Sequence, residues 1–395
     1  MILDILYRVF SENGYASLMM RRMKADEKDT AFIAETVYGT LRNYSLLEYQ
    51  WRDKASRTKL KTALLLDMSV YQLLFMDVPA YAAVSEAVSL ASKHEKKFVN
   101  AILRSVMKEG LRKPQEAEIL YSHPAWIASL FKAHYGVDNA LKIMAYNQQK
   151  PLSWGRINTL KTTLEEVKKE EGLSFVDGIA FTYEGALQKS SLFQQGKVLI
   201  QNYSSQQIVK FLDVRENMRV LDACAAPGTK TQQIAMFMNN KGEIIANELH
   251  EHRLKLIGQL MERTGTTIVK TVQGDASEEN RFEKESFDRI LLDVPCSGLG
   301  DLSHKPEIRW HLKPEDIDEI TKIQLAILHA NAPYLRKSGV MVYSTCTLNR
   351  KENENQIRVF LETHEDFELL EEHTFFPFAF KSDGFYCAAL RKRKS

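Results

Sequence analysis

Cysteine is scarce in this chain of 395 residues and is scattered along it. None of the four cysteines belongs to a CxxC pair or lies near a histidine doublet; they are Cys224, Cys296, Cys346 and Cys387. Zinc modules and disulfide-rich domains need such pairs at short spacings. The sequence therefore predicts no metal site and no disulfide framework, which leaves packing or catalysis as the uses of these thiols.

An excess of one charge and a long apolar run are also missing. The 53 Lys and Arg residues nearly balance the 51 Asp and Glu residues, for a formal net charge of +2. A polyanionic partner must therefore be recognised through local clusters. No apolar stretch approaches the roughly 18 residues of a membrane helix, and the start, MILDILYRVF, lacks the features of a secretory signal. We expect a soluble cytosolic protein of two or three folded units, without a membrane partner.

The first part of the chain, to about Gly110, has helical periodicity throughout. Its last apolar positions recur at the spacing of one helix face: Val99, Ile102, Leu103 and Val106. Residues 62–76 are apolar nearly all round, which is typical of a helix buried at the centre of a bundle. The basic run WRDKASRTKLK at 51–61 is more typical of a solvated helix end or loop than of a phosphate contact. An all-α domain is predicted here.

A small α+β connector is predicted after a further helical stretch at 113–149. Short strands are expected at 153–158, 175–183 and 198–201. Thr162 or Thr163, with a glutamate three residues later, predicts the capped start of a helix between the first two strands.

From about Ser205, short apolar strands alternate with helix-length segments. The predicted strands are 219–222, 243–248, 268–275, 287–294, 339–344 and 385–390. Near-continuous apolar strands of this kind are typical of a parallel sheet covered on both faces, which predicts a doubly wound α/β domain. The final basic residues, 391–394, are expected to be a frayed, solvated tail.

Acidic residues follow several of these strands, at the edge of the sheet where such folds bind ligands. Asp222 ends the first strand, Glu248 the second and Asp275 the third, while Asp293 ends the fourth. The turn after Asp222 lacks the GxGxxG pattern of a pyrophosphate site, which argues against a nucleotide-dependent oxidoreductase. A nucleoside with a positive centre and no phosphates fits these carboxylates, so we expect S-adenosylmethionine as the cofactor.

Two cysteines stand at the ends of neighbouring predicted strands and indicate the type of methyl transfer. Cys296 follows Asp293 and Pro295, and Cys346 ends the next strand. Methylation of a nitrogen or oxygen needs no thiol, whereas C5 of a pyrimidine becomes nucleophilic only after a thiolate adds to C6. Cysteine in place of an aromatic residue after Pro295 also argues against methylation of exocyclic amines. Cys224 and Cys387 are interpreted as small apolar packing residues.

The chain also carries five motifs in a fixed order: LDACAAPGTKT (221–231), LLDVPCSGLG (291–300), HKPEIRW (304–310), YSTCTL (343–348) and DGFYCAAL (383–390). They closely resemble the motifs of the Sun family of RNA cytosine-C5 methyltransferases. The segments RNYSLLEYQWRD, SVYQLLFMDVPAYAAVSEAV and FVNAILRSVM resemble the NusB-type RNA-binding bundle. The resemblance implies a NusB-like domain at 1–122, a helical linker and connector at 123–204, and a Rossmann-like methyltransferase domain at 205–395.

The resemblance also implies roles for individual residues. Cys346 would be the nucleophile, Cys296 would assist its release, and Asp293, with Lys230, would contact the cytosine edge. The cofactor would be held by one loop and by Glu248, Asp275 and Asp293. The residues of that loop are Cys224, Ala225, Ala226, Pro227, Gly228, Thr229 and Lys230. Thr229 and Asn202 depart from the family pattern; Thr229 requires a backbone at negative φ, and the role of Asn202 stays open.

The implied partner is RNA, and the combination of domains is similar to that of bacterial members that methylate cytosine 967 of 16S rRNA in standard numbering. We expect a monomer that unstacks the target base, with Lys59, Lys61, Lys305 and Arg309 near the RNA. Two alternatives stay open: a 5-methylcytosine methyltransferase for another rRNA site or for tRNA, and an RNA-binding assembly module with a vestigial methylase.

Overall fold

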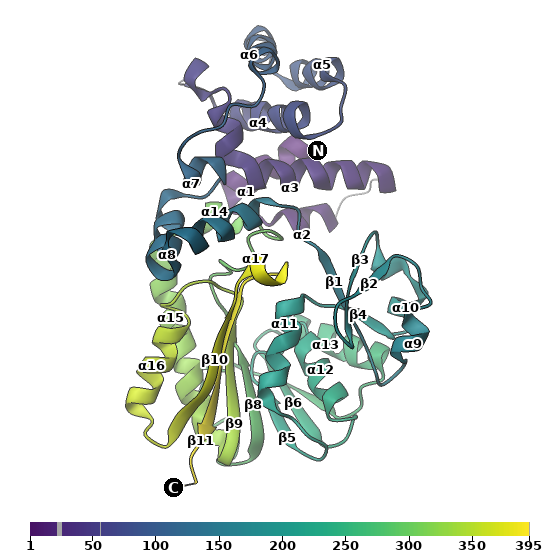
Figure 1. The fold of residues 1–395 in the computed structure, drawn as a ribbon, viewed down its shortest axis with the longest axis vertical. Helices are drawn as coiled ribbons and strands as arrows, with labels where there is room; N and C mark the ends of the chain where they lie inside the picture. Colours follow the sequence, from purple (N-terminus) through teal and green to yellow (C-terminus); the bar gives the residue numbers. More distant parts are fainter. Residues whose placement is uncertain (22–25, 56, 395) are drawn as a thin grey trace. The chain divides into compact units, whose positions relative to one another are not determined.

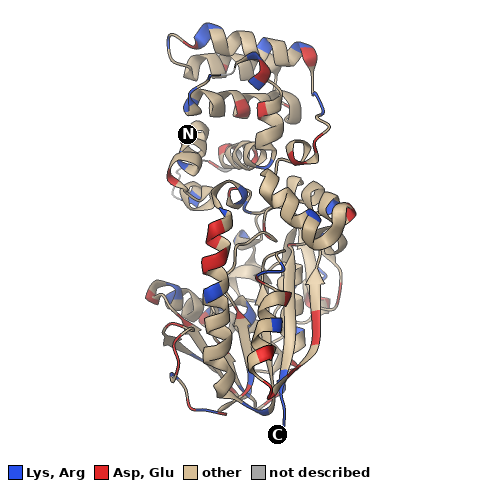
Figure 2. Ribbon diagram, turned by 90° about the vertical axis from the view of Figure 1, so that its left-hand side faces the viewer, with Lys and Arg blue, Asp and Glu red and all other residues tan. Residues whose placement is uncertain are grey.

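The computed structural model describes residues 1–21, 26–55 and 57–394 and divides into two compact units (Figure 1). One unit comprises Met1–Lys150 together with Leu302–Leu312, and the other comprises Pro151–Asp301 and Lys313–Ser395. Lys and Arg are interspersed with Asp and Glu over both units (Figure 2). Among the described residues, no helix has the length and apolar character needed to cross a membrane.

The first unit is helical, as predicted. Its helices are α1 (Ile2–Glu12), α2 (Ala16–Arg21), α3 (Glu27–Tyr49), α4 (Leu60–Phe75), α5 (Ala80–Leu90), α6 (Lys96–Glu109), α7 (Ala117–Leu120) and α8 (Ala125–Gln148). Helix α4 is buried from Thr62 to Gln72, which confirms the predicted central helix. Helix α6 buries the four predicted apolar residues and ends at Gly110, whose φ of 67° suits glycine.

A segment from much later in the sequence completes this unit. Residues Leu302–Leu312, including the short helix α14 (Ile308–His311), pack with the helical bundle. The Trp310 ring lies 5.1 Å from the Tyr44 ring, and its Nε1 donates to the Leu41 carbonyl at 3.0 Å. Arg309 is fully buried and donates to three carbonyls, those of Ser122, Asn147 and Leu302. The prediction that Arg309 contacts RNA is therefore wrong.

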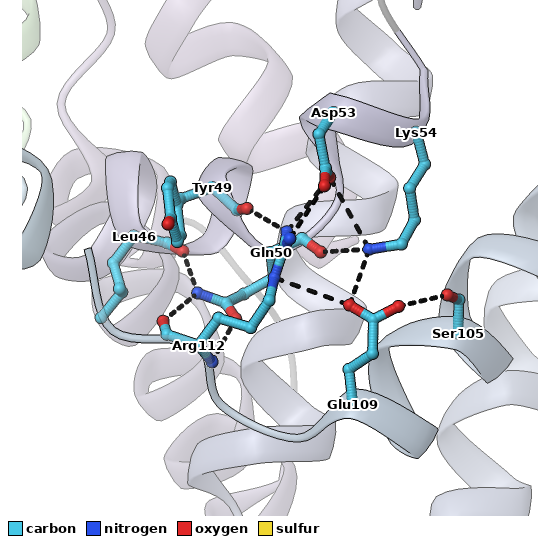
Figure 3. Close-up of polar contacts among 8 residues, drawn as sticks. All are labelled: Leu46, Tyr49, Gln50, Asp53, Lys54, Ser105, Glu109 and Arg112. Atoms are coloured by element: carbon cyan, nitrogen blue, oxygen red, sulfur yellow. Dashed lines mark hydrogen bonds and ion pairs between the residues drawn. The ribbon is translucent and has the colours of Figure 1, made fainter.

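The first part of the basic run after α3 makes contacts within the helical unit, as Asp53 and Lys54 show (Figure 3). A short 3₁₀ turn, Arg52–Lys54, directs Lys54 to Glu109, with Nζ and Oε2 at 2.9 Å. Arg112 pairs with Asp53 in the same cluster, with Nη1 and Oδ2 at 2.8 Å. Lys59 and Lys61 are exposed. The interpretation of this run as a helix end and loop is consistent with these contacts.

The second unit begins with a small antiparallel sheet in the order β2-β3-β1-β4. Its strands are β1 (Ser153–Ile157), β2 (Leu173–Phe175), β3 (Ala180–Tyr183) and β4 (Val198–Ile200), with short helices α9 (Leu164–Val167) and α10 (Ser191–Gln194). Thr163 caps α9 by accepting from the Glu166 backbone N–H, as one of the two predicted registers requires.

The larger sheet has seven strands in the order β10-β11-β9-β8-β5-β6-β7. The strands are β5 (Arg219–Asp222), β6 (Glu243–Glu248), β7 (Val269–Gln273), β8 (Phe287–Asp293), β9 (Leu335–Thr345), β10 (Phe367–Phe375) and β11 (Phe385–Lys392). Strands β5 to β9 pair in parallel, but β10 and β11 run antiparallel. The sheet is therefore mixed, which corrects the prediction of a wholly parallel sheet.

Helices cover both faces of this sheet (Figure 1). They are α11 (Tyr203–Ile208), α12 (Thr229–Phe237), α13 (Glu251–Thr264), α15 (Pro314–Asn331), α16 (Glu354–Thr363) and α17 (Pro377–Phe380), with 3₁₀ turns at Val209–Leu212 and Ala332–Tyr334. A further 3₁₀ turn, Leu187–Lys189, belongs to the small sheet. One core cluster joins the sheet to α15 and α16, and another joins its opposite face to α11 and α12. Strand β11 extends to Lys392, and Arg391 pairs with Glu368, so the predicted fraying does not begin at Arg391.

Candidate active site

The loop between β5 and α12 forms the centre of the site. Gly228 precedes α12 with a φ of 97°, a conformation that residues with a Cβ rarely adopt. Thr229 is the first helical residue and is absent from the positive-φ positions, consistent with its predicted negative φ. A narrow cavity is lined by this loop and by two of the predicted acids: Asp222, Cys224, Ala225, Ala226, Pro227, Thr229, Lys230 and Asp293.

A buried arginine from the small sheet holds the beginning of α12. Arg156 is fully buried and donates from Nη2 to the Thr229 carbonyl at 2.9 Å and to the Gln232 side chain at 2.5 Å. Burial lowers the pKa of Arg156 to about 9. The sequence analysis did not single out this residue, because its contacts depend on segments more than 70 residues apart.

Three carboxylates follow the adjacent parallel strands β5, β6 and β7. Asp222 accepts from Thr231 Oγ1 at 2.7 Å, and burial raises its pKa to about 7. Glu248 is buried and accepts from the His250 backbone N–H at 3.0 Å. Asp275 accepts from both the backbone and the hydroxyl of Ser277, which lowers its pKa. The structure thus places the predicted acids at successive strand ends.

Lys230 and Asp293 form an ion pair beside the cavity. Lys230 Nζ lies 2.8 Å from Asp293 Oδ2, and the other carboxylate oxygen accepts from Ser344 Oγ at 2.8 Å. Lys230 is only 8% exposed. The structure therefore brings together two residues predicted to act at one base edge, and adds Ser344, which the sequence analysis missed.

The two cysteines at the ends of β8 and β9 meet directly. Their Sγ atoms are 3.1 Å apart, and both residues are partly exposed. The contact with Cys346, together with burial, raises the pKa of the Cys296 thiol. Cys387 is fully buried in β11, in keeping with a packing role. Cys224, expected to be a packing residue by itself, packs beside the sheet core but also lines the cavity.

Asn202, whose role the sequence left open, caps α11. Its Oδ1 accepts from the Ser204 backbone N–H at 3.1 Å and from Ser382 Oγ at 2.5 Å. Asn202 therefore joins the beginning of this helix to the segment before β11, and these contacts account for it as a structural residue.

The residues of the loop and strand ends fit a nucleoside carrying a positive centre. Asp222 Oδ1 is buried without a hydrogen-bond partner among the described residues, so an acceptor remains available at the cavity. Glu248 and Asp275 supply further acceptors at the next two strand ends. This set of oxygen acceptors suits ribose hydroxyls, an amino group and an ammonium group better than phosphates.

Comparison with known proteins supports the predicted NusB-like and methyltransferase domains. Residues 209–391 match the family of 16S rRNA methyltransferases RsmB/F, residues 1–108 match the NusB family, and residues 123–170 match the ferredoxin-like domain of RsmF/B-like methyltransferases. A probable ribosomal RNA small subunit methyltransferase B of Bacillus subtilis is 33% identical, covering 99% of this chain and 98% of that protein. The chain belongs to the RsmB/F family.

A second relative and one crystal structure agree with the RsmB/F family assignment. The ribosomal RNA small subunit methyltransferase B of Proteus mirabilis is 33% identical over 93% of this chain and 91% of its own. The crystal structure of PH0851 shares the fold, with a TM-score of 0.81 over 99% of this chain and 97% of that chain at 24% identity. The RsmB/F assignment confirms the predicted NusB-like and methyltransferase folds and S-adenosylmethionine as the cofactor. The domain boundaries near residues 122 and 204 stay predictions.

Proposed function

We propose that this RsmB/F-family rRNA methyltransferase transfers a methyl group from S-adenosylmethionine to C5 of one cytosine in 16S rRNA, cytosine 967 in standard numbering. The observation that carries the proposal is the pair of thiols, 3.1 Å apart, at the ends of β8 and β9. Carbon methylation of a pyrimidine needs a nucleophile and a group that helps to remove it. Two adjacent thiols, on the loops that follow β8 and β9, supply these groups.

Cys346 begins the reaction. Its thiolate forms an Sγ–C6 bond, and the electrons of the C5=C6 double bond become available at C5. The contact with Cys346 and burial raise the pKa of the Cys296 thiol, which fits the role of Cys296 in release rather than in attack. Asp293, with Lys230, hydrogen-bonds the N3 and amino edge of the cytosine, which favours charge build-up in the ring.

Methylation at C5 and release of Cys346 from C6 of the cytosine follow. The loop 224–230, with Glu248, Asp275 and Asp293, would hold S-adenosylmethionine, which would supply the electrophilic methyl group for C5 and leave as the demethylated thioether. Removal of the C5 proton, assisted by Cys296 or by a water beside it, restores the C5=C6 bond and expels the Cys346 thiolate.

The helical unit supports an RNA substrate. It belongs to the NusB family, and Lys59, Lys61 and Lys305 are exposed on it. We infer that this unit binds folded rRNA through phosphate and shape, while the target base is unstacked from a loop, where unstacking costs least.

Bisulfite sequencing of rRNA and tRNA from a strain that lacks the gene tests the proposal. We expect one 5-methylcytosine to disappear from 16S rRNA and all others to persist. Loss of a mark from tRNA or from another rRNA site would assign the chemistry to a different substrate. Unchanged marks, together with absent S-adenosylmethionine binding in calorimetry, would contradict the enzyme assignment and favour an assembly module.

A further inference from the structure

A fully buried carboxylate lies behind the two thiols and takes no part in the chemistry above. Glu352 is 0% exposed and accepts hydrogen bonds at both of its oxygens. Oε2 accepts from the Ser297 backbone N–H at 2.8 Å and from Gln324 Nε2 at 3.1 Å. Oε1 accepts from Ser297 Oγ at 2.5 Å and from Asn349 Nδ2 at 2.9 Å.

Apart from Gln324, which lies in α15, these donors belong to the two loops that carry the cysteines. Ser297 directly follows Cys296, while Asn349 lies three residues after Cys346. Ser297 Oγ also lies 2.8 Å from Thr347 Oγ1, and Thr347 directly follows Cys346. Glu352 therefore joins the loop after β8 to the loop after β9, immediately behind the sulfur pair.

Neutral donors alone stabilise this carboxylate. The described residues contain no Lys or Arg within ion-pair distance of Glu352, although an unpaired buried carboxylate is costly. These four donors, together with Thr347 Oγ1 at 3.5 Å from Oε1, compensate for burial only if both loops keep their positions. Displacing either loop leaves part of the carboxylate without donors, so the network favours one separation of the loops.

We propose that Glu352 is a positioning residue that fixes the distance and direction between Cys296 and Cys346. The inference rests on the proposed C5 methylation, because only that reaction needs both sulfur atoms at one carbon pair. Gln324 strengthens the arrangement, since its Nε2 donates to Glu352 and also to the Pro295 carbonyl at 2.9 Å. Glu352 itself touches no reacting atom.

Disulfide trapping measures this positioning without any turnover. Diamide oxidation of the full-length protein, followed by peptide mapping, gives the rate of the Cys296–Cys346 crosslink. Glu352→Gln replaces one acceptor oxygen by an amino group that faces donors, and we expect the crosslinking rate to fall about tenfold. Glu354→Gln is the matched control, because Glu354 is the next glutamate along the chain and has one oxygen without a hydrogen-bond partner among the described residues.

Kinetics and binding distinguish positioning from general damage. For Glu352→Gln we expect kcat to fall about 100-fold, while the KM for RNA and the Kd for S-adenosylmethionine stay within about twofold of wild type. Glu354→Gln is expected to match wild type in all three. A Glu352→Gln protein with wild-type crosslinking and wild-type kcat would overturn the proposal.

A milder variant covers the case in which Glu352→Gln does not fold. Ser297→Ala removes one donor to Glu352 and the contact with Thr347 but keeps the backbone donor, and we expect slower crosslinking in a protein that still unfolds cooperatively. Wild-type crosslinking in Ser297→Ala would contradict the role of this network. Because crosslinking needs no RNA, a protein that crosslinks as predicted but makes no 5-methylcytosine would refute the proposed function and leave the positioning role standing.

Discussion

At the scale of single residues, the surroundings of Cys296 disfavour its thiolate. Its contact with Cys346 and its burial raise the pKa of this thiol. A thiolate is the nucleophilic form of cysteine, so the sulfur that keeps its proton is the poorer nucleophile. The raised pKa of Cys296 is consistent with the release role that the family resemblance implies for it.

Replacing the nucleophile should abolish product formation. In the proposed mechanism, Cys346→Ala removes the atom that forms the Sγ–C6 bond, so we expect no 5-methylcytosine by mass spectrometry of nucleosides. Binding of S-adenosylmethionine should persist, because the cofactor loop is intact. Cys387→Ala, in the buried part of β11, is the control and should remain active. Product from the Cys346→Ala protein would contradict the nucleophile assignment.

Replacing the second thiol should trap the reaction instead. Cys296→Ala still permits addition and methylation, but elimination is slowed, so a covalent protein–RNA adduct should accumulate. Denaturing electrophoresis under turnover conditions detects this adduct as a band of reduced mobility. The doubly substituted Cys296→Ala, Cys346→Ala protein should show no such band. Absence of the adduct from Cys296→Ala alone would remove the release role.

Asp222 should make stability depend on pH. Its pKa is raised by burial from 3.8 to about 7, so the folded state favours the protonated acid. The stabilisation is complete below pH 3.8 and is lost as the pH rises through about 7. Relative to Asp222→Asn, the cofactor-free wild type should therefore lose stability by at most about 1.4 kcal/mol per pH unit across that window. Denaturant unfolding of both proteins measures the difference, and a difference independent of pH would exclude this behaviour.

Sequence patterns located most of the candidate site but not its supports. The acids and thiols could be found because each directly follows an apolar strand, and parallel strands bring their ends to one edge. Glu352 and Arg156 could not be found this way, since their importance arises from hydrogen bonds to segments distant in sequence. Nothing in the residues around Glu352 distinguishes it from an exposed helix-flanking acid.

At the scale of elements, the start of α12 depends on one backbone conformation. Gly228→Ala adds a Cβ at a φ of 97°, whose nearest neighbours are at an ordinary 3.4 Å, so the cost is conformational and about 1–2 kcal/mol. We expect S-adenosylmethionine to bind about tenfold more weakly in calorimetry. Gly258→Ala, in α13 with open space around the new Cβ, should bind normally. Equal affinities for both variants would show that the loop adapts without cost.

Strand β10 is absent from the strands that the sequence predicts. Phe367–Phe375 reads FELLEEHTF, and its middle residues are exposed because it is an edge strand paired only with β11. An antiparallel edge strand needs few apolar residues, whereas the prediction relied on near-continuous apolar runs. The same reliance made the sheet seem wholly parallel, because β11 has the apolar pattern of a central strand whatever its direction.

At the scale of the whole molecule, the helical unit depends on Leu302–Leu312. Trp310→Ala removes the ring that packs near Phe10 and Tyr44 and the donor to Leu41, at a cost of about 3 kcal/mol. Hydrogen exchange should accelerate in α1 and α3, while S-adenosylmethionine still binds. Tyr81→Ala, at a side chain that is 80% exposed in the same unit, should leave exchange unchanged. Unaltered protection in Trp310→Ala would show that the bundle is complete without the segment.

The late position of the Trp310 segment in the sequence also determines when the helical unit can complete its fold during translation. The bundle emerges first, yet the residues that fill its last apolar positions follow the loop bearing Cys296 and leave the exit tunnel much later. Domains usually fold as they emerge, from the N-terminus onward. In this chain, the surface that Trp310 covers in the folded bundle therefore stays exposed on the nascent helices until most of the catalytic half has been translated.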